Sequence, residues 1–177
     1  MPTAEIVEAL NQQMTDELYS SNLYLQMCAW CEAEGLDGAA AFFRRHVSEE
    51  FMHRDKIVQY LFECDADVSI SGVPAPRKDY DSLLEVIEAA YAHEQKVTDS
   101  INNLAELALK SRDFNTFNVM QWFIAEQREE EVLFRGVLDQ AKLAAFTGDT
   151  GQALFHLNAY MGKVAVRGPV ETTPSSV

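Results

Sequence analysis

Apolar residues recur every three or four positions along four long segments of this chain. The first segment runs from about Thr3 to Glu34, and we expect Thr3 to be its N-cap and Gly35 its C′ residue. The predicted apolar stripe contains Ile6, Leu10, Met14, Leu18, Leu25, Cys28 and Cys31. Because residues at this spacing share one face of an α-helix, the segment is predicted to be a helix with one buried face.

The second segment, from about Gly38 to Cys64, repeats this pattern. Its candidate core positions are Phe42, Val47, Ile57, Tyr60 and Leu61. Only the short link Gly35-Leu36-Asp37-Gly38 separates it from the first segment. A link this short makes the two helices antiparallel neighbours, so they are predicted to form a hairpin.

Residues 65–81 differ from the segments on either side. They show no helical period and contain several serines together with Pro74 and Pro76. A connection of this length without regular structure is unusual inside a compact domain. In a four-helix bundle it has a use, because one long connection crosses from one end of the bundle to the other. We therefore expect residues 65–81 to be such a crossover.

The helical period returns after the crossover. The pattern Ser82-x-x-Glu85 is a capping box, which predicts the start of a third helix over about 82–110. The predicted core positions of this helix are Val86, Ile87, Ala90, Val97, Ile101, Leu104 and Ala108. A short turn, Ser111-Arg112-Asp113, follows it and predicts a second helical hairpin.

The fourth helix is predicted over about 114–146. Its stripe includes Phe117, Met120, Phe123, Ile124, Phe134, Val137, Leu138 and Ala145. A turn is expected at 148–151, followed by a short fifth helix over about 152–161. Residues 162–177 contain two prolines with several serines and threonines, which indicates a flexible tail.

These elements predict an all-α fold. It is a four-helix bundle with a long crossover between the second and third helices and a short fifth helix at the C-terminus. A length of 177 residues fits one domain with a sizeable core, which we place at residues 1–161.

The chain carries a formal net charge of -14. This charge argues against binding to nucleic acid, which requires a basic face, and it favours the attraction of cations. No run of eighteen apolar residues is present, so no membrane span is predicted. The N-terminal residues lack a basic region followed by an apolar region, so we expect no export signal and a cytoplasmic location.

Three cysteines, Cys28, Cys31 and Cys64, lie in helical segments. A Cys-x-x-Cys pair on a helix can be redox-active or bind a metal. The interpretation favoured here is simpler: the three are small buried hydrophobic residues in a reducing compartment.

Each long helix carries a polar group where its apolar stripe should continue. These groups are Glu17 in the first helix, Glu50 and His53 in the second, Glu94 in the third, and Gln127 and Glu130 in the fourth. Glu50 and His53 are three residues apart and therefore share a helix face. Buried carboxylates without cations repel one another and lose their charge, whereas two divalent cations among them would stabilise the set. Oxygen ligands with imidazole suit iron, manganese or zinc.

A second group of acidic residues lies beside the first. It consists of Glu49, Glu126, Glu129, Glu130 and Glu131. Spacing alone leaves two interpretations open, an acidic surface face or a further cation site. Tyr24 lies seven residues after Glu17 on the same helix face, where it could supply an electron during oxygen reduction or pack in the core. For Trp122, core packing is the favoured interpretation.

Several motifs resemble the bacterial non-haem ferritins of the enterobacterial cytoplasmic type. The motifs are Asn11-Gln12-Gln13-Met14, Asp16-Glu17-Leu18-Tyr19-Ser20-Ser21, Ala29-Trp30-Cys31, Gly38-Ala39-Ala40-Ala41-Phe42, Arg44-Arg45-His46, Glu49-Glu50, Thr116-Phe117-Asn118 and Glu126-Gln127-Arg128-Glu129-Glu130-Glu131. They occur in order over about residues 6–146. The resemblance implies a ferritin-like bundle that oxidises Fe(II) with O₂ or peroxide and stores ferric mineral inside a hollow shell of 24 identical subunits.

The resemblance also implies roles for individual residues. It assigns the first iron to Glu17, Glu50 and His53, with Glu50 bridging to the second iron. It assigns the second iron to Glu94 and Glu130, with Gln127 beside it. A third iron site would consist of Glu49, Glu126, Glu129 and Glu130, and Tyr24 would be the tyrosine next to the dinuclear centre. Residues after Met161 do not match the family pattern.

Alternatives to a non-haem ferritin remain open. A bacterioferritin would hold haem through a methionine directly after the bridging glutamate, but here that position is Phe51, so no haem is expected. A rubrerythrin-like peroxidase needs two Cys-x-x-Cys pairs, and a DNA-protecting mini-ferritin often carries a basic arm; neither feature is present. Two further alternatives are a di-iron protein that keeps its iron as a cofactor and a four-helix scaffold without an oxidase centre.

Overall fold

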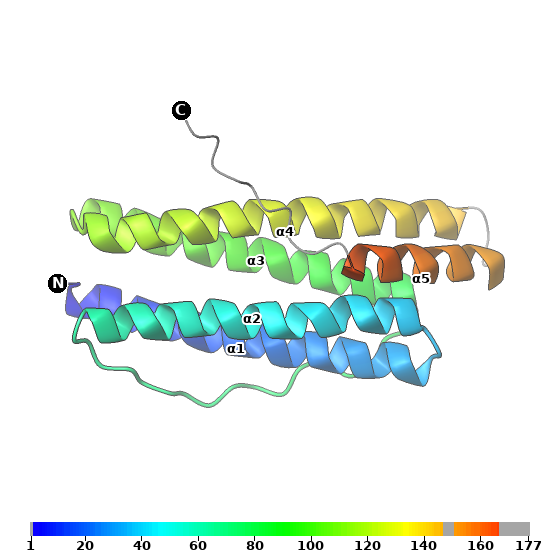
Figure 1. The fold of residues 1–177 in the computed structure, drawn as a ribbon, viewed down its shortest axis with the longest axis horizontal. Coiled ribbons are helices and arrows are strands. Elements are labelled where there is room, and N and C mark those ends of the chain that lie inside the picture. Colours follow the sequence, from blue (N-terminus) through cyan, green and yellow to red (C-terminus); the bar gives the residue numbers. More distant parts are fainter. Residues whose placement is uncertain (1, 147–150, 167–177) are drawn as a thin grey trace.

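The computed structural model describes residues 2–146 and 151–166. Within these ranges the chain forms five helices, which confirms the predicted all-α fold: α1 (Ala4–Ala33), α2 (Asp37–Glu63), α3 (Leu83–Lys110), α4 (Phe114–Phe146) and α5 (Gly151–Val166). Figure 1 shows two antiparallel hairpins, α1–α2 and α3–α4, that lie side by side. The crossover runs along the α1–α2 hairpin from one end of the bundle to the other. Helix α5 lies at the end where α2 begins and α4 ends.

The predicted helix boundaries follow from local hydrogen bonds. The Thr3 hydroxyl accepts a hydrogen bond from the Ile6 amide at 3.3 Å, and Gly35 adopts a φ of +72°, a conformation that glycine adopts without strain. The Ser82 hydroxyl likewise accepts from the Glu85 amide at 3.2 Å. The capping box differs from expectation in one detail, because the Glu85 carboxylate accepts from the amide before the cap residue rather than from the amide of the cap residue itself.

Two apolar clusters fill the bundle. One contains Tyr24, Phe42, Phe43 and Phe134, and the other contains Leu10, Ile57, Ile101 and Phe123. The buried polar residues Glu17, Glu50, His53, Glu94, Gln127 and Glu130 belong to neither cluster. The fold therefore places the polar set within the bundle, where the surrounding packing can hold the side chains in fixed positions.

Two positions of the predicted stripes are wrong. Leu25 is 41% exposed and Ile124 is 37% exposed. On α1 the buried face continues through Glu17, Ser21 and Tyr24. Because these residues are polar or amphipathic, the apolar pattern does not follow the buried face here. It selects Leu25, which directly follows Tyr24 and points away from the core.

Asn11 ties the crossover to α1. Its side-chain amide donates to the backbone oxygen of Asp67 at 2.9 Å, and its side-chain oxygen accepts from the amide of Ser69 at 2.6 Å. One side chain thus satisfies two backbone groups of a segment that has no helix of its own. The crossover is held in place without regular secondary structure.

Helix α5 is longer than predicted. It continues to Val166, so residues 162–166 are helical, and the predicted start of the tail at residue 162 is wrong. The prolines, serines and threonines of residues 162–177 predicted a tail that begins at Gly162, but this glycine packs closely against Gly38. A Cβ atom at Gly38 would overlap the backbone oxygen of Asn158, and one at Gly162 would lie 3.2 Å from the Gly38 Cα atom. The side chain of Asn158 also accepts a hydrogen bond from the Ala39 amide at 2.9 Å.

Residues 148–150 of the predicted turn at 148–151 lie outside the described residues, as do the predicted tail from residue 167 onward and the side chain of Ala145. The prediction of a turn at Gly151 is wrong, because α5 begins at this residue. Among the described helices, none is both long enough and apolar enough to cross a membrane. The three cysteines are free, with Cys28 and Cys31 fully buried, and burial raises the pKa of both thiols. These features agree with the interpretation of Cys28 and Cys31 as buried hydrophobic residues. For Cys64 that interpretation is wrong, because this residue is only half-buried.

Candidate metal centre

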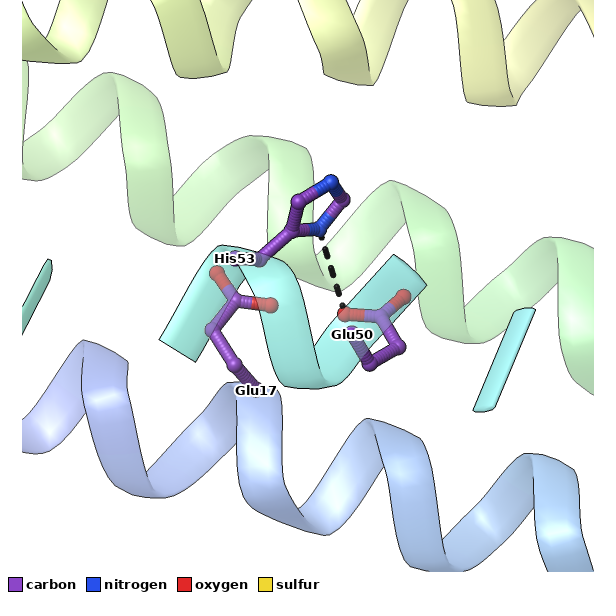
Figure 2. Close-up of side chains that lie close together, drawn as sticks. All are labelled: Glu17, Glu50 and His53. Carbon is purple, nitrogen blue, oxygen red and sulfur yellow. Dashed lines mark ion pairs between the residues drawn. The ribbon is translucent and has the colours of Figure 1, made fainter. Parts of the chain in front are cut away.

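Glu17, Glu50 and His53 point toward one another between α1 and α2 (Figure 2). Each offers one ligand atom, and these atoms lie within 4.8 Å of one another. The His53 Nδ1 atom is 3.4 Å from the Glu50 Oε2 atom, and all three residues are at least 95% buried. The three-residue spacing in α2 thus places a carboxylate and an imidazole on one face, and α1 adds a second carboxylate.

A polar chain from α3 fixes the position of Glu17. The Ser100 hydroxyl donates to the side-chain oxygen of Gln13 at 2.6 Å, and the Gln13 amide donates to Glu17 Oε1 at 2.8 Å. The second oxygen of Glu17 has no partner. The hydrogen bond to Oε1 orients the carboxylate, and Oε2 keeps a free lone pair inside the protein. Outer hydrogen bonds orient the ligands of metal sites in the same way.

Glu94 on α3 is held by two other helices. The Tyr24 hydroxyl on α1 donates to its Oε1 atom, and the Gln127 amide on α4 donates to its Oε2 atom at 3.0 Å. Burial raises the pKa of Glu94 to about 7, and the carboxylate of Glu130 adds to the shift. Burial and the same Glu94 carboxylate raise the pKa of Tyr24 well above its ordinary value.

Glu130 lies beside His46, a histidine for which the sequence pattern predicted no role. The Nε2 atom of His46 is 3.3 Å from the Glu130 Oε2 atom and 3.8 Å from the Glu49 Oε2 atom. Burial alone would raise the pKa of Glu130, but the imidazole of His46 outweighs it and holds that pKa below its ordinary value. His46 precedes Glu50 by four residues and therefore shares its helix face, which is the signal that could have identified it.

The electrostatics of the buried carboxylates favour a bound cation. Burial raises the pKa of Glu17 and Glu50 well above the usual value, and the nearby carboxylates of Glu50 and Glu94 respectively add to these shifts. In the described part of the chain, five buried side-chain atoms lack a hydrogen-bond partner: Glu17 Oε2, His46 Nε2, Glu49 Oε2, Glu50 Oε2 and Glu130 Oε2. All five are carboxylate oxygen or imidazole nitrogen atoms, which can bind metals, and they belong to the predicted site or lie next to it. A divalent cation would supply the missing partner for such groups.

Glu126 and Glu129 are half-buried on α4. Among the described residues, two groups of three ligand atoms come within 4.8 Å of one another, and neither group includes Glu126 or Glu129. The second group is His46, Glu49 and Glu130. The structure therefore brings together two of the four residues that the resemblance assigns to a third site.

Two aromatic residues near the site differ in their surroundings. Tyr24 is fully buried and contacts Glu94 directly, whereas Trp122 is 37% exposed, so the prediction that Trp122 packs in the core is wrong. The Lys56 Nζ atom lies 4.3 Å from the Trp122 ring centroid. The ring centroids of Trp122 and His53 lie 5.6 Å apart in an edge-to-face arrangement, so Trp122 packs against His53.

A second histidine also lacked an assignment from sequence. His93 precedes Glu94 on α3, and its Nε2 atom is 2.7 Å from the Ser20 hydroxyl. Burial, followed by the nearby positive charge of Lys96, lowers the pKa of His93 to about 4. The ring centroids of His93 and Tyr24 lie 6.0 Å apart, so His93 packs beside the tyrosine that donates a hydrogen bond to Glu94.

An antiparallel four-helix bundle that buries carboxylates and imidazoles from facing helices defines the class of ferritin-like metal proteins. A family model described as "Ferritin-like domain" matches residues 7–144. The chain is 44% identical to the bacterial non-heme ferritin of Campylobacter jejuni over 94% of this chain and 98% of that protein. It is 44% identical to the bacterial non-heme ferritin of Escherichia coli O157:H7 over 87% of this chain and 92% of that protein.

Solved structures agree with these matches. An open pore ferritin from the archaeon Archaeoglobus fulgidus superposes with a TM-score of 0.88 at 34% identity, covering 92% of this chain and 98% of that one. The chain belongs to the ferritin family, and its resemblance to the bacterial non-haem ferritins is confirmed.

Proposed function

We propose that this protein stores iron, and that it oxidises Fe(II) at a dinuclear centre inside each subunit before ferric mineral is deposited. The observation that carries the proposal is the buried group of Glu17, Glu50 and His53, whose ligand atoms lie within 4.8 Å of one another. Its two carboxylates each retain an oxygen without a partner. The similarity to proteins named bacterial non-heme ferritin supports iron as the metal.

The proposed ligand set extends over all four long helices. Glu17, Glu50 and His53 bind the first iron, and Glu50 bridges to the second. Glu94 and Glu130 bind the second iron, with Gln127 beside it. Support comes from burial, since each of these residues is less than a tenth exposed. It also comes from repulsion, because Glu94 and Glu130 raise the pKa of Glu50 in the absence of a cation, after the larger effect of burial.

In the proposed reaction, two Fe(II) ions each give one electron to O₂, which is reduced to hydrogen peroxide. Hydrolysis of the two Fe(III) ions then releases protons and yields ferric oxo-hydroxide. The chain contributes a carboxylate-rich environment, which favours the harder and more highly charged Fe(III) ion. Tyr24 lies against Glu94 and is positioned to supply a further electron, with Glu94 as the acceptor of its proton. The amide of Gln127 stands where a second imidazole would bind metal more firmly, which suits iron that moves on.

The proposed assembly is a shell of 24 identical subunits without haem. Large apolar side chains are exposed on the described surface, and burial of such side chains between subunits would stabilise a shell. They include Met52, Phe62, Ile70, Leu143 and Phe155, each at least 60% exposed. Phe51, at the position where a bacterioferritin would bind haem, supports the non-haem form. The cytoplasmic location and the absence of nucleic-acid partners remain proposals from the N-terminal sequence and the net charge.

A single substitution tests the assigned centre. Glu17→Ala removes a ligand on α1, and we expect it to abolish rapid Fe(II) oxidation in a stopped-flow assay in air. Glu8→Ala is the matched control, because Glu8 lies on the same helix but is exposed, and it should oxidise Fe(II) at the rate of the unmodified protein. Rapid oxidation by folded Glu17→Ala protein would show that the centre is assigned to the wrong residues.

A further inference from the structure

Trp122 links the proposed dinuclear centre to the surface of the subunit. Its ring meets the ring of His53, a proposed ligand of the first iron, edge to face with the centroids 5.6 Å apart. His53 is 5% exposed, whereas Trp122 is 37% exposed. Because an indole is among the side chains that lose an electron most readily, Trp122 is a second aromatic residue, besides Tyr24, from which an oxidant at the centre could draw an electron.

Lys56 places a positive charge over the indole ring of Trp122. Its Nζ atom lies 4.3 Å from the ring centroid. Lys56 follows His53 by three residues on α2, so both side chains lie on the side of this helix that faces Trp122. Lys56 forms no ion pair with any residue in the described part of the chain. Its charge therefore acts on the ring without a carboxylate to neutralise it.

A cation in this position opposes the loss of an electron from the ring. While the indole is neutral, its negative face attracts the ammonium group. An indole that loses one electron becomes a radical cation, and the attraction is then replaced by repulsion between two positive charges about 4 Å apart. Lys56 therefore makes Trp122 a poorer electron donor than an indole without a neighbouring charge.

Tyr24 differs from Trp122 in what surrounds it. Its hydroxyl donates to a carboxylate oxygen of Glu94, which can accept the proton as the phenol loses an electron. The indole nitrogen of Trp122 donates to no protein group within residues 2–146 and 151–166. Of the two aromatic residues, one thus has a proton acceptor that assists its oxidation, and the other has a cation that opposes it.

The hydrogen peroxide formed in the proposed reaction takes up two electrons and two protons to become two water molecules. When one Fe(II) ion supplies the first of these electrons, a side chain beside the centre can supply the second. We propose that the charge of Lys56 keeps Trp122 reduced, so that this second electron comes from Tyr24, whose proton passes to Glu94. Lys56 acts through Trp122 and is a positioning residue. Because the dinuclear centre draws the electron, this inference rests on the proposed function and deepens it.

Peptide mass spectrometry after iron turnover by the full-length protein tests the inference. Each protein receives Fe(II) and hydrogen peroxide, and oxidised Trp122 is quantified with Trp30 of the same sample as the reference. Lys56→Met keeps a long side chain but removes the charge. It should raise the oxidised fraction of Trp122 at least about fivefold, because charges about 4 Å apart repel even in bulk water. Lys56→Arg keeps the cation and should match the unmodified protein, as should Lys78→Met, which changes an exposed lysine of the crossover.

Electron paramagnetic resonance of samples frozen during turnover identifies the electron donor. The unmodified protein should give the signal of a tyrosyl radical, and Lys56→Met should give an added signal of an indole radical. Equal oxidation of Trp122 in Lys56→Met and the unmodified protein would overturn the inference. Equal oxidation in Lys56→Arg and Lys56→Met would also overturn it, because the lysine would then act by covering the ring and not by its charge.

A measurement without metal separates these failures from a failure of the proposed function. In proteins that also carry Trp30→Phe, Trp122 is the only tryptophan, and light-excited lumiflavin, an uncharged oxidant, can draw an electron from it. The indole radical should form several-fold faster in Lys56→Met. That result, together with no rapid Fe(II) oxidation by the unmodified protein, would contradict the dinuclear centre but support the effect of Lys56. An unchanged rate would overturn the inference whether or not the protein oxidises iron.

Discussion

Tyr24 on α1 donates a hydrogen bond to Glu94 on α3, and both side chains are fully or almost fully buried. The bond joins the two hairpins of the bundle at the level of the proposed dinuclear centre. It orients one oxygen of Glu94, while Gln127 orients the other. The tyrosine is therefore an outer partner of a proposed iron ligand as well as a neighbouring aromatic ring.

Removal of this hydroxyl should weaken the second metal site. Tyr24→Phe keeps the ring packing but leaves Glu94 with one donor, so we expect the affinity for the second Zn²⁺ or Fe²⁺ ion to fall about 10- to 100-fold. Calorimetric titration with Zn²⁺ measures this. Tyr19→Phe, a half-buried tyrosine on the same helix, is the control. Unchanged binding in Tyr24→Phe would mean that Gln127 alone positions Glu94.

The metal-free protein should lose stability as the pH rises. The pKa of Glu94 is about 7 in the folded chain and lies near 4.5 when the chain is unfolded. A carboxyl group whose pKa is raised on folding stabilises the folded chain at a pH below its pKa in the unfolded chain. That stabilisation is lost as the pH rises through the pKa of the group in the folded chain. Scanning calorimetry should therefore show Tm falling between about pH 5 and pH 8, less steeply in Glu94→Gln.

The comparison with Glu94→Gln also removes an opposing effect. Burial, followed by Lys96, lowers the pKa of His93 to about 4, so His93 destabilises the fold as the pH falls below about 6.5. This effect is present in both proteins and cancels in the difference between them. Identical pH profiles would show that Glu94 does not carry the expected proton, and saturation with Zn²⁺ should flatten the profile of the unmodified protein.

Helix α5 should be sensitive to a methyl group on α2. Gly38→Ala places a Cβ atom against the backbone oxygen of Asn158, so the two helices must separate, and we expect a loss of about 1–3 kcal/mol in the free energy of unfolding. Gly136→Ala is the matched control, because nothing lies within 4 Å of its new Cβ atom. That variant should gain about 0.5–1 kcal/mol from reduced chain entropy. Equal stabilities by chemical denaturation would disprove the close contact.

The helices and the core of the proposed dinuclear centre could be predicted from sequence because both depend on spacing within one helix. Glu50 and His53 share a face of α2 wherever that helix packs. Stripe positions such as Leu25 were wrong where the buried face is itself polar, because the apolar pattern then has a gap. The predicted start of the tail at Gly162 was wrong because the composition of residues 162–177 does not reveal that Gly162 packs closely against Gly38.

The role of His46 depends on contacts that spacing does not contain. Its orientation is set within α2 by the Phe42 carbonyl, but its neighbour Glu130 comes from α4, 84 positions further along the chain. Arg45, which donates a hydrogen bond to Glu49, is anchored to α5, whose length was underestimated. The acidic residues Glu49 and Glu130 could be predicted from sequence as a pair of candidates, while their contact with His46 required the packed helices.

Iron loading tests the central claim most directly. The metal-free protein is exposed in air to a large excess of Fe(II), and the product is separated on a sizing column with iron and protein measured in each fraction. We expect far more iron than the ligand sites can bind to elute with a particle of several hundred kilodaltons. Only two or three iron ions per chain on a small oligomer would mean that the protein keeps its metals as a cofactor, and the storage function would be contradicted.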